Sequence, residues 1–321
     1  MTKRRRVGRP LLVAGAASAI AVLTPVATSG QHVRFELVEG WAGLPAGVDR
    51  FGMTLGLELD AHQNLWVFQR CFSTDCVDGP EERLPAVLRY DPSGRLVDSW
   101  GEGMFVWPHG FHLDAEGNLW TSDARGTGGK GHTVMKHAPD GKVLMTLGTP
   151  GVAGVGEDAF DGPADVLVAP NGDIFVADGH GNDRIVKFSS DGEFLLEWGT
   201  EGTLLGQFNE PHALAMDSRG RLFVADRMNQ RIQVFDQNGR FLAVWPAIQA
   251  SGLHIAPGDI VYVADYQLRQ GIVIARASDL QEIGFIDGTL AEAVTVDPAG
   301  NVFTGESIPR NVKKFERRVG P

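Results

Sequence analysis

The chain has 321 residues, 41 of them glycine, and a formal net charge of −11 at neutral pH. Glycine is therefore about 13% of the chain, against about 7% in an average soluble protein. Because glycine weakens helix interiors, this composition disfavours a helix-rich fold and favours many short strands joined by tight turns. The acidic balance argues against a general nucleic-acid-binding protein, which would need a basic face, so we expect no nucleic-acid partner.

The first 29 residues have the pattern of an export signal. Basic residues at 3–6 and 9 precede an apolar segment at 11–23, and the small residues Ala27 and Ser29 follow it. The segment is shorter than the about 20 residues that span a bilayer. We predict a cleaved signal at 1–29 and a mature protein at 30–321, periplasmic or secreted, with no stable membrane span; an uncleaved anchor is the alternative. Removing residues 1–29 leaves 24 basic and 40 acidic residues, a net charge of −16.

The two cysteines, Cys71 and Cys76, lie five positions apart. In an exported protein this spacing favours a disulfide that closes a small loop, and two free thiols are the alternative. A zinc site at these cysteines is disfavoured, because the chain has no second cysteine pair.

A strand–turn–strand pattern fills the rest of the chain. Residues 112–123 (HLDAEGNLWTSD) and 215–226 (AMDSRGRLFVAD) are two copies, and the position of Asp114 recurs at 60, 114, 169, 217, 256 and 297. Short strands with periodic turn and aromatic signals predict an all-β, six-bladed β-propeller with about four strands per blade. The last copy lacks an evident fourth strand, and residues 35–41 resemble it. We therefore predict that an N-terminal strand completes the last blade and closes the ring.

An acidic residue ends the second strand of five copies: Asp123, Asp178, Asp226, Asp265 and Glu306. A group needed once for catalysis would not recur blade after blade. We therefore predict that these carboxylates cap turns and strand ends.

Aligning the copies predicts which residues face the ring axis. Five positions before the recurring turn residue stand Leu55, His109, Ala164, His212, Ser251 and Glu292. The polar members fall on alternate blades, so their side chains can converge. Two histidines and a carboxylate form a known zinc or non-haem iron set, and we predict His109, His212 and Glu292 as metal ligands. His254 competes, but it lies three places beyond its axial position, where packing or a rim hydrogen bond is expected.

The repeats resemble the NHL family. Residues 181–188 (GNDRIVKF) and 228–235 (MNQRIQVF) match its Asn-x-Arg-Ile-x-x-Phe signature. The resemblance implies a propeller, but NHL propellers have many functions.

Five further segments together resemble peptidyl-α-hydroxyglycine α-amidating lyase: 107–110 (WPHG), 163–166 (PADV), 177–179 (ADG), 207–212 (QFNEPH) and 224–227 (VADR). The resemblance covers roughly residues 50–316. It implies a six-bladed propeller with zinc on the axis. These enzymes split a peptidyl-α-hydroxyglycine into a peptide amide and glyoxylate.

The resemblance carries over to some site residues and not to others. The family binds zinc with three histidines, of which two fall on His109 and His212 and the third on Glu292. A catalytic tyrosine falls on His180, and a methionine near the last ligand falls on Leu290. The catalytic arginine of the family is matched by Arg70. From their chemistry we predict Arg70 as a clamp for a substrate carboxylate, with a surface salt bridge as the alternative. We predict His180 as a general base, with a plain turn residue as the alternative. The changed metal ring is compatible with a shift of substrate or reaction.

We therefore predict a monomeric, zinc-dependent, lyase-like enzyme that acts on a peptide or small molecule bearing a carboxylate. Another divalent metal, including calcium, is an alternative cofactor. Two other functions stay open. One is an exported, non-enzymatic propeller whose segments 71–86 and 124–133 bind protein or carbohydrate. The other is a calcium-dependent, lactonase-like hydrolase, which the histidine pair disfavours.

Overall fold

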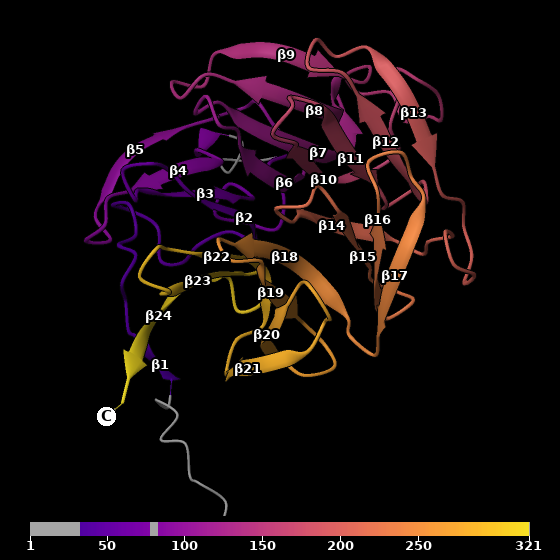
Figure 1. The fold of residues 1–321 in the computed structure, drawn as a ribbon. Helices are drawn as coiled ribbons and strands as arrows, with labels where there is room; N and C mark the ends of the chain where they lie inside the picture. The colour runs from indigo at the N-terminus through magenta and orange to yellow at the C-terminus, as the bar shows by residue number, and fades with distance from the viewer. Residues whose placement is uncertain (1–32, 78–82, 321) are drawn as a thin grey trace, which may run out of the picture.

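The computed structural model describes residues 33–77 and 83–320, which form a ring of six four-stranded antiparallel sheets (Figure 1). The predicted all-β, six-bladed propeller is confirmed. The predicted export signal at 1–29 lies outside the described residues. Within 33–77 and 83–320, no helix has the length and apolar character needed to cross a bilayer.

Each blade contributes one strand to each of four concentric layers. The inner strands are β2 (Thr54–Leu59), β6 (Pro108–Leu113), β10 (Pro163–Val168), β14 (Pro211–Met216), β18 (Ala250–Ala256) and β22 (Ala291–Val296). The second strands are β3 (Leu65–Gln69), β7 (Leu119–Thr127), β11 (Ile174–Asp178), β15 (Leu222–Asp226), β19 (Ile260–Asp265) and β23 (Val302–Glu306). The third strands are β4 (Val87–Tyr90), β8 (Lys130–His137), β12 (Arg184–Phe188), β16 (Arg231–Phe235), β20 (Gly271–Arg276) and β24 (Asn311–Val319). The outer strands are β5 (Leu96–Trp100), β9 (Val143–Leu147), β13 (Phe194–Trp198), β17 (Phe241–Pro246), β21 (Glu282–Asp287) and β1 (Val33–Val38).

The recurring turn between the inner and second strands has a local cause. In blade two, Asp114 Oδ1 accepts the backbone N–H groups of Glu116 and Asn118 at 3.0 and 2.9 Å. Gly117 adopts a φ of 84°, which glycine reaches without a steric penalty. Asp side chains favour such turns because they bond their own backbone. The Asp-x-x-Gly pattern of the repeat is therefore a turn that reverses the chain between two buried strands.

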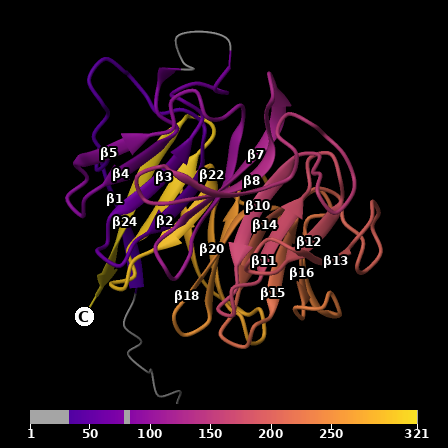
Figure 2. The same cartoon turned by 90° about the horizontal axis from the view of Figure 1, so that it is seen from above.

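The N-terminal strand closes the ring as predicted. β1 pairs antiparallel with β24, with Val33 opposite Val319 and Val38 opposite Lys314, and it completes the sheet β1–β24–β23–β22 (Figure 2). The strand ends at Val38, so the predicted segment 35–41 extends three residues too far. Trp41, just beyond the strand, lies 5.0 Å from the Phe303 ring, between blades six and one.

The hydrophobic core consists of six clusters, one at each interface between neighbouring blades. The second strands lie inside these interfaces, and β11 and β15 are buried along their whole length. Each inner strand also contacts the inner strands of both adjacent blades. The blades therefore bury their apolar surface against one another, and the inner strands surround the axis.

One buried histidine belongs to this core. His137 on β8 packs 5.1 Å from the Trp100 ring of blade one, and its ring nitrogens contact Thr121 Oγ1 at 3.0 Å and the Gly141 carbonyl at 3.4 Å. Burial lowers the pKa of His137 to about 4. The folded protein therefore keeps this ring neutral at a pH at which the unfolded chain protonates it.

We expect His137 to make the protein less stable in mild acid. As the pH falls from about 6.5 towards 4, the unfolded chain binds a proton that the folded protein does not, so the free energy of unfolding decreases. At about pH 5 this loss is about 2 kcal/mol. Urea unfolding of the wild type and of His137→Gln at about pH 7.5 and about pH 5 would measure it. The same pH dependence in both proteins would contradict the prediction.

Candidate functional site

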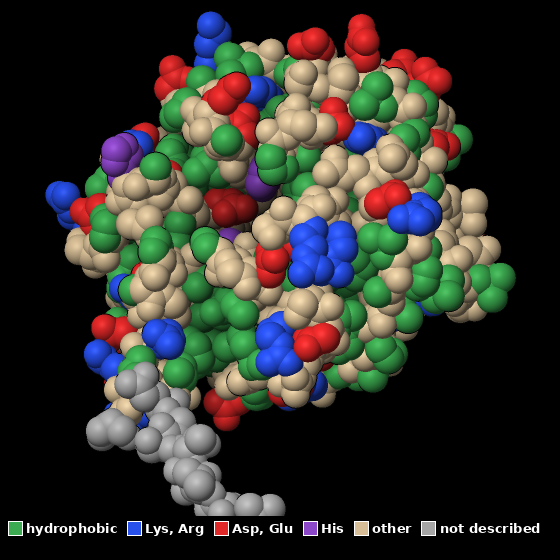
Figure 3. Space-filling model, in the orientation of Figure 1, with side chains coloured by type: hydrophobic (Ala, Val, Ile, Leu, Met, Phe, Trp, Pro, Cys, Tyr) green, Lys and Arg blue, Asp and Glu red, His purple; other side chains and the backbone are tan. Residues whose placement is uncertain are grey.

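The six aligned axial positions lie around one narrow central cavity of about 60 Å³, lined by Leu55, His109, Ala164, His212, Ser251 and Glu292 among others. Figure 3 shows the hollow at the centre of the ring, where histidine and acidic side chains are visible. The predicted alignment of the blades is therefore confirmed for this part of each inner strand.

The recurring carboxylates fix the loops that lead into the inner strands. Asp123 accepts the backbone N–H groups of Val106 and Trp107 at 2.8 and 2.5 Å. Asp226 accepts the N–H of Asn209 at 2.8 Å. These loops end two or three residues before the axial histidines of β6 and β14. The prediction that the carboxylates are structural caps is confirmed, because they are buried and bond the backbone.

The axial histidines are each held by the next blade. His109 Nδ1 lies 2.7 Å from the Ala164 carbonyl, and His212 Nδ1 lies 2.7 Å from the Ser251 carbonyl. A carbonyl only accepts, so each Nδ1 carries the hydrogen and each neutral ring keeps its lone pair on Nε2. Burial, together with the neighbouring His180, holds the pKa of His109 well below its usual range. Burial and Arg227 do the same for the pKa of His212.

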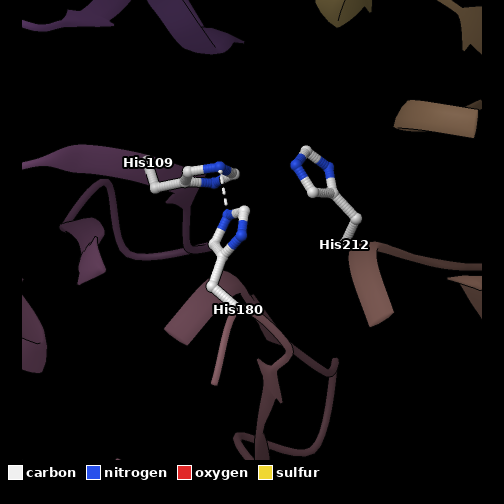
Figure 4. Close-up of side chains that lie close together, drawn as sticks. All are labelled: His109, His180 and His212. Carbon is white, nitrogen blue, oxygen red and sulfur yellow. Dashed lines mark hydrogen bonds between the residues drawn. The ribbon is translucent and has the colours of Figure 1, made fainter. Parts of the chain in front are cut away.

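His180 completes a group of three imidazoles (Figure 4). It follows β11, and its Nδ1 lies 3.1 Å from Glu210 Oε1 while its Nε2 lies 2.8 Å from His109 Nε2. The ligand atoms of His109, His180 and His212 all lie within 4.8 Å of one another. Metal-binding histidines commonly have their second ring nitrogen held by a carbonyl or a carboxylate, as all three do here. The group could therefore hold a metal ion.

Glu292 does not belong to this group, and the structure brings His180 to the axial histidines in its place. Glu292 Oε1 accepts a hydrogen bond from Ser307 Oγ at 3.2 Å and lies 3.8 Å from Arg227 Nη2. Arg227 Nη1 lies 2.8 Å from His212 Nε2. The guanidinium thus stands between the carboxylate and the imidazole. Glu292 Oε2 is buried and has no hydrogen-bond partner among the described residues.

Arg70 lies beside the axis and is 3% exposed. Its Nε donates to the Pro108 carbonyl at 3.2 Å, and its Nη1 donates to the Thr74 carbonyl at 3.4 Å. Thr74 belongs to the loop closed by the Cys71–Cys76 disulfide, which is present as predicted. Burial lowers the pKa of Arg70 to about 9, so the guanidinium stays protonated at neutral pH. Nη2 has no hydrogen bond to a described residue.

Three neighbours of the histidines were missed by the sequence analysis: Trp107, Glu210 and Arg227. Glu210 lies 3.4 Å from Arg227 Nη1 as well as contacting His180. Burial raises the pKa of Glu210, but the hydrogen bond to His180 and the charge of Arg227 outweigh this effect. The pKa of Glu210 is therefore below its usual value. Each of these three residues lies within two positions of an axial histidine or directly after a recurring carboxylate. This proximity in the sequence is the signal by which they could have been predicted. His254 stands apart, with its ring 6.5 Å from Tyr262.

Comparisons with known proteins agree with this architecture. The NHL repeat model matches residues 208–235. Human NHL repeat-containing protein 3 is 32% identical over 76% of this chain and 78% of its own length. Peptidyl-alpha-hydroxyglycine alpha-amidating lyase 1 of Drosophila melanogaster is 38% identical over 50% of this chain, and the match spans 31% of that protein. A gluconolactonase structure from Xanthomonas campestris is 16% identical over 84% of this chain and 88% of its own, with a TM-score of 0.62, which shows a shared fold.

Proposed function

The chain belongs to the family of NHL repeat-containing proteins, and on that premise we propose that it is an exported, metal-dependent lyase of the peptidyl-α-hydroxyglycine α-amidating type. The observation that carries the proposal is the group of three imidazoles whose ligand atoms lie within 4.8 Å of one another. The similarity to the Drosophila lyase supports the reaction class. The disulfide supports export, because disulfides persist in oxidising compartments.

The three histidines fit zinc. His109 Nε2 and His180 Nε2 face each other at 2.8 Å, while an oxygen holds the Nδ1 of each ring. Two lone pairs at this distance repel each other unless a proton or a cation lies near both. Three neutral imidazoles are a known zinc set, whereas calcium takes oxygen ligands. Zinc held here would act as a Lewis acid that polarises the substrate hydroxyl.

In this proposal two predicted roles are exchanged: His180 is a metal ligand and Glu292 is the general base. Glu292 lines the same cavity as His109 and His212, and its buried Oε2 lacks a hydrogen-bond partner among the described residues. Ser307 and Arg227 hold the other oxygen in place. A buried acceptor without a donor is costly, and a substrate hydroxyl would satisfy it.

The remaining residues orient the substrate. Arg70 Nη2 binds the carboxylate of the hydroxyglycine, and Oε2 of Glu292 takes the proton of its hydroxyl. The carbon–nitrogen bond then breaks with its electron pair on the nitrogen, and the electron pair of the O–H bond forms the carbonyl of glyoxylate. The protonated Glu292 returns its proton to the nitrogen, which gives the amide and restores the carboxylate. Glu210 positions His180 and Arg227 through its contacts at 3.1 and 3.4 Å.

Metal content distinguishes a ligand from a base. We expect His180→Ala to lose stoichiometric zinc, because one of three ligands is gone. Glu292→Gln keeps the shape of the side chain and should retain zinc. His254→Gln is a matched control, a partly buried histidine of an inner strand outside the group. Elemental analysis of the purified proteins measures this, and zinc lost from Glu292→Gln but kept by His180→Ala would return Glu292 to the ligand set.

Activity tests the reaction itself. We expect zinc-loaded protein to release glyoxylate from an N-acyl-α-hydroxyglycine. The kcat of Glu292→Gln should fall by about 10²- to 10⁴-fold, which is the usual contribution of a general base. His254→Gln should be close to wild type. Fully zinc-loaded protein that releases no glyoxylate would refute the lyase and favour a binding propeller.

Arg227 competes with a metal ion for His212. Its Nη1 occupies the lone pair of His212 Nε2 at 2.8 Å, and its positive charge repels a cation. We therefore expect Arg227→Met to bind zinc about tenfold more tightly than the wild type, since a charged hydrogen bond no longer has to be broken. Competition with a coloured chelator measures the affinity. Equal or weaker binding by the variant would contradict this role.

A further inference from the structure

The hairpin of β7 and β8 differs from its counterparts in the other blades. β7 has nine residues, more than any other second strand. Its pairing with β8 is irregular: Asp123 lies opposite Thr133 and Gly126 opposite Gly131, so two residues face the single residue His132. The two residues are Ala124 and Arg125. A bulge of this kind redirects a side chain, and bulges are common beside active sites.

The bulge places Arg125 against Trp107. Ala124 N–H donates to the Trp107 carbonyl at 3.1 Å, and the Arg125 guanidinium carbon lies 4.0 Å from the centre of the Trp107 ring. The Arg70 guanidinium carbon lies 3.5 Å from the same centre. Two guanidinium groups that close to one ring would overlap on a single face. Trp107 therefore lies between them, with Arg70 on one face and Arg125 on the other.

The two arginines differ in what they can still bind. Arg70 is buried and uses two of its nitrogens on backbone carbonyls. Arg125 is exposed, and it makes no hydrogen bond or ion pair with any residue in 33–77 or 83–320. Stacking on the indole fixes its plane and uses none of its N–H donors, which have no hydrogen bond to a described residue. A fixed and open guanidinium suits a planar carboxylate.

Arg125 lines a cavity that leads to the histidine group. The cavity has a volume of about 240 Å³, and its walls include Trp107, Arg125, His132, Asp161 and His180. The Trp107 and His180 rings are 5.2 Å apart. The Arg125 guanidinium carbon lies 4.0 Å from the centre of the Trp107 ring. Together these two distances place that carbon at most 9.2 Å from the centre of the His180 ring. Asp161 faces His132 at 3.8 Å and forms no ion pair with Arg125.

We propose that Arg125 forms a second carboxylate subsite, so that preferred substrates carry an acidic group in the acyl part that becomes the amide product. This inference rests on the proposed function. Arg70, on the buried face of Trp107, takes the carboxylate of the hydroxyglycine. In this arrangement the rest of the substrate extends towards the exposed face of Trp107, where Arg125 lies. In a chain with a net charge of −11, a dianionic substrate needs such local cations to bind.

Two unreactive probes of similar length test the subsite. N-Succinylglycine carries two carboxylates and N-butyrylglycine carries one. We expect zinc-loaded wild type to bind the dianion about tenfold more tightly in calorimetry, as one charge-assisted contact allows. Arg125→Ala should abolish this ratio, and Arg125→Lys should restore part of it. Arg219→Ala, which removes an exposed charge from the β14–β15 turn, should leave the ratio unchanged.

The proposed subsite and the proposed lyase reaction can be refuted independently of each other. Equal binding of both probes by the wild type, or a ratio that survives in Arg125→Ala, would overturn the subsite even if glyoxylate is released. Conversely, a ratio that depends on Arg125 supports the subsite even if N-succinyl-α-hydroxyglycine releases no glyoxylate. That second result would overturn the lyase alone.

Discussion

A buried carboxylate at the end of a second strand fixes the loop that enters the inner strand of the same blade, and the axial site depends on this contact. Asp123, Asp178 and Asp226 accept backbone N–H groups located 17 positions before them in the sequence. Glu306 accepts the N–H of Leu290, 16 positions before it, at 2.9 Å. A buried carboxylate is costly unless it is bonded, so each one holds its loop firmly. The axial residue of each blade follows two or three residues after the bonded N–H group, so the same contact fixes its location.

The histidines also depend on the contact between blades. The Nδ1 of His109 is held by blade three and that of His212 by blade five. His180 is held by Glu210, which belongs to the loop before β14. Each imidazole is therefore oriented by the blade that follows its own. A change in blade packing would rotate these rings without touching them, which makes the six apolar interfaces part of the site.

The sequence predicted the features that periodicity controls. The six blades, the closing strand and the axial positions of His109 and His212 follow from a repeat that places equivalent residues at equivalent points. The disulfide was predicted separately, from the short spacing of the two cysteines. The role of His180 could not be predicted in this way, because it lies in a turn outside the repeated strands. There it fits only because Gly162 leaves room: a Cβ on Gly162 would lie 2.6 Å from the Cβ of His180. The separation of Glu292 from the group depends on Arg227 standing between them, which no spacing along the chain records. The spacing of residues along the chain also does not predict the bulge that places Arg125 against Trp107.

Ring closure has a consequence for the order in which the site is assembled. Val33 pairs with Val319, 286 positions later, so this contact has almost the largest loop-closure entropy that the chain allows. The three histidines come from the consecutive blades two, three and four, and blade five orients His212, so the group can be in place before the last blade is synthesised. Arg70 and Glu292 come from blades one and six, on either side of the seam. The half of the site that would hold a metal can thus form early, whereas the half that would bind and deprotonate a substrate is complete only when the last strand has paired with the first.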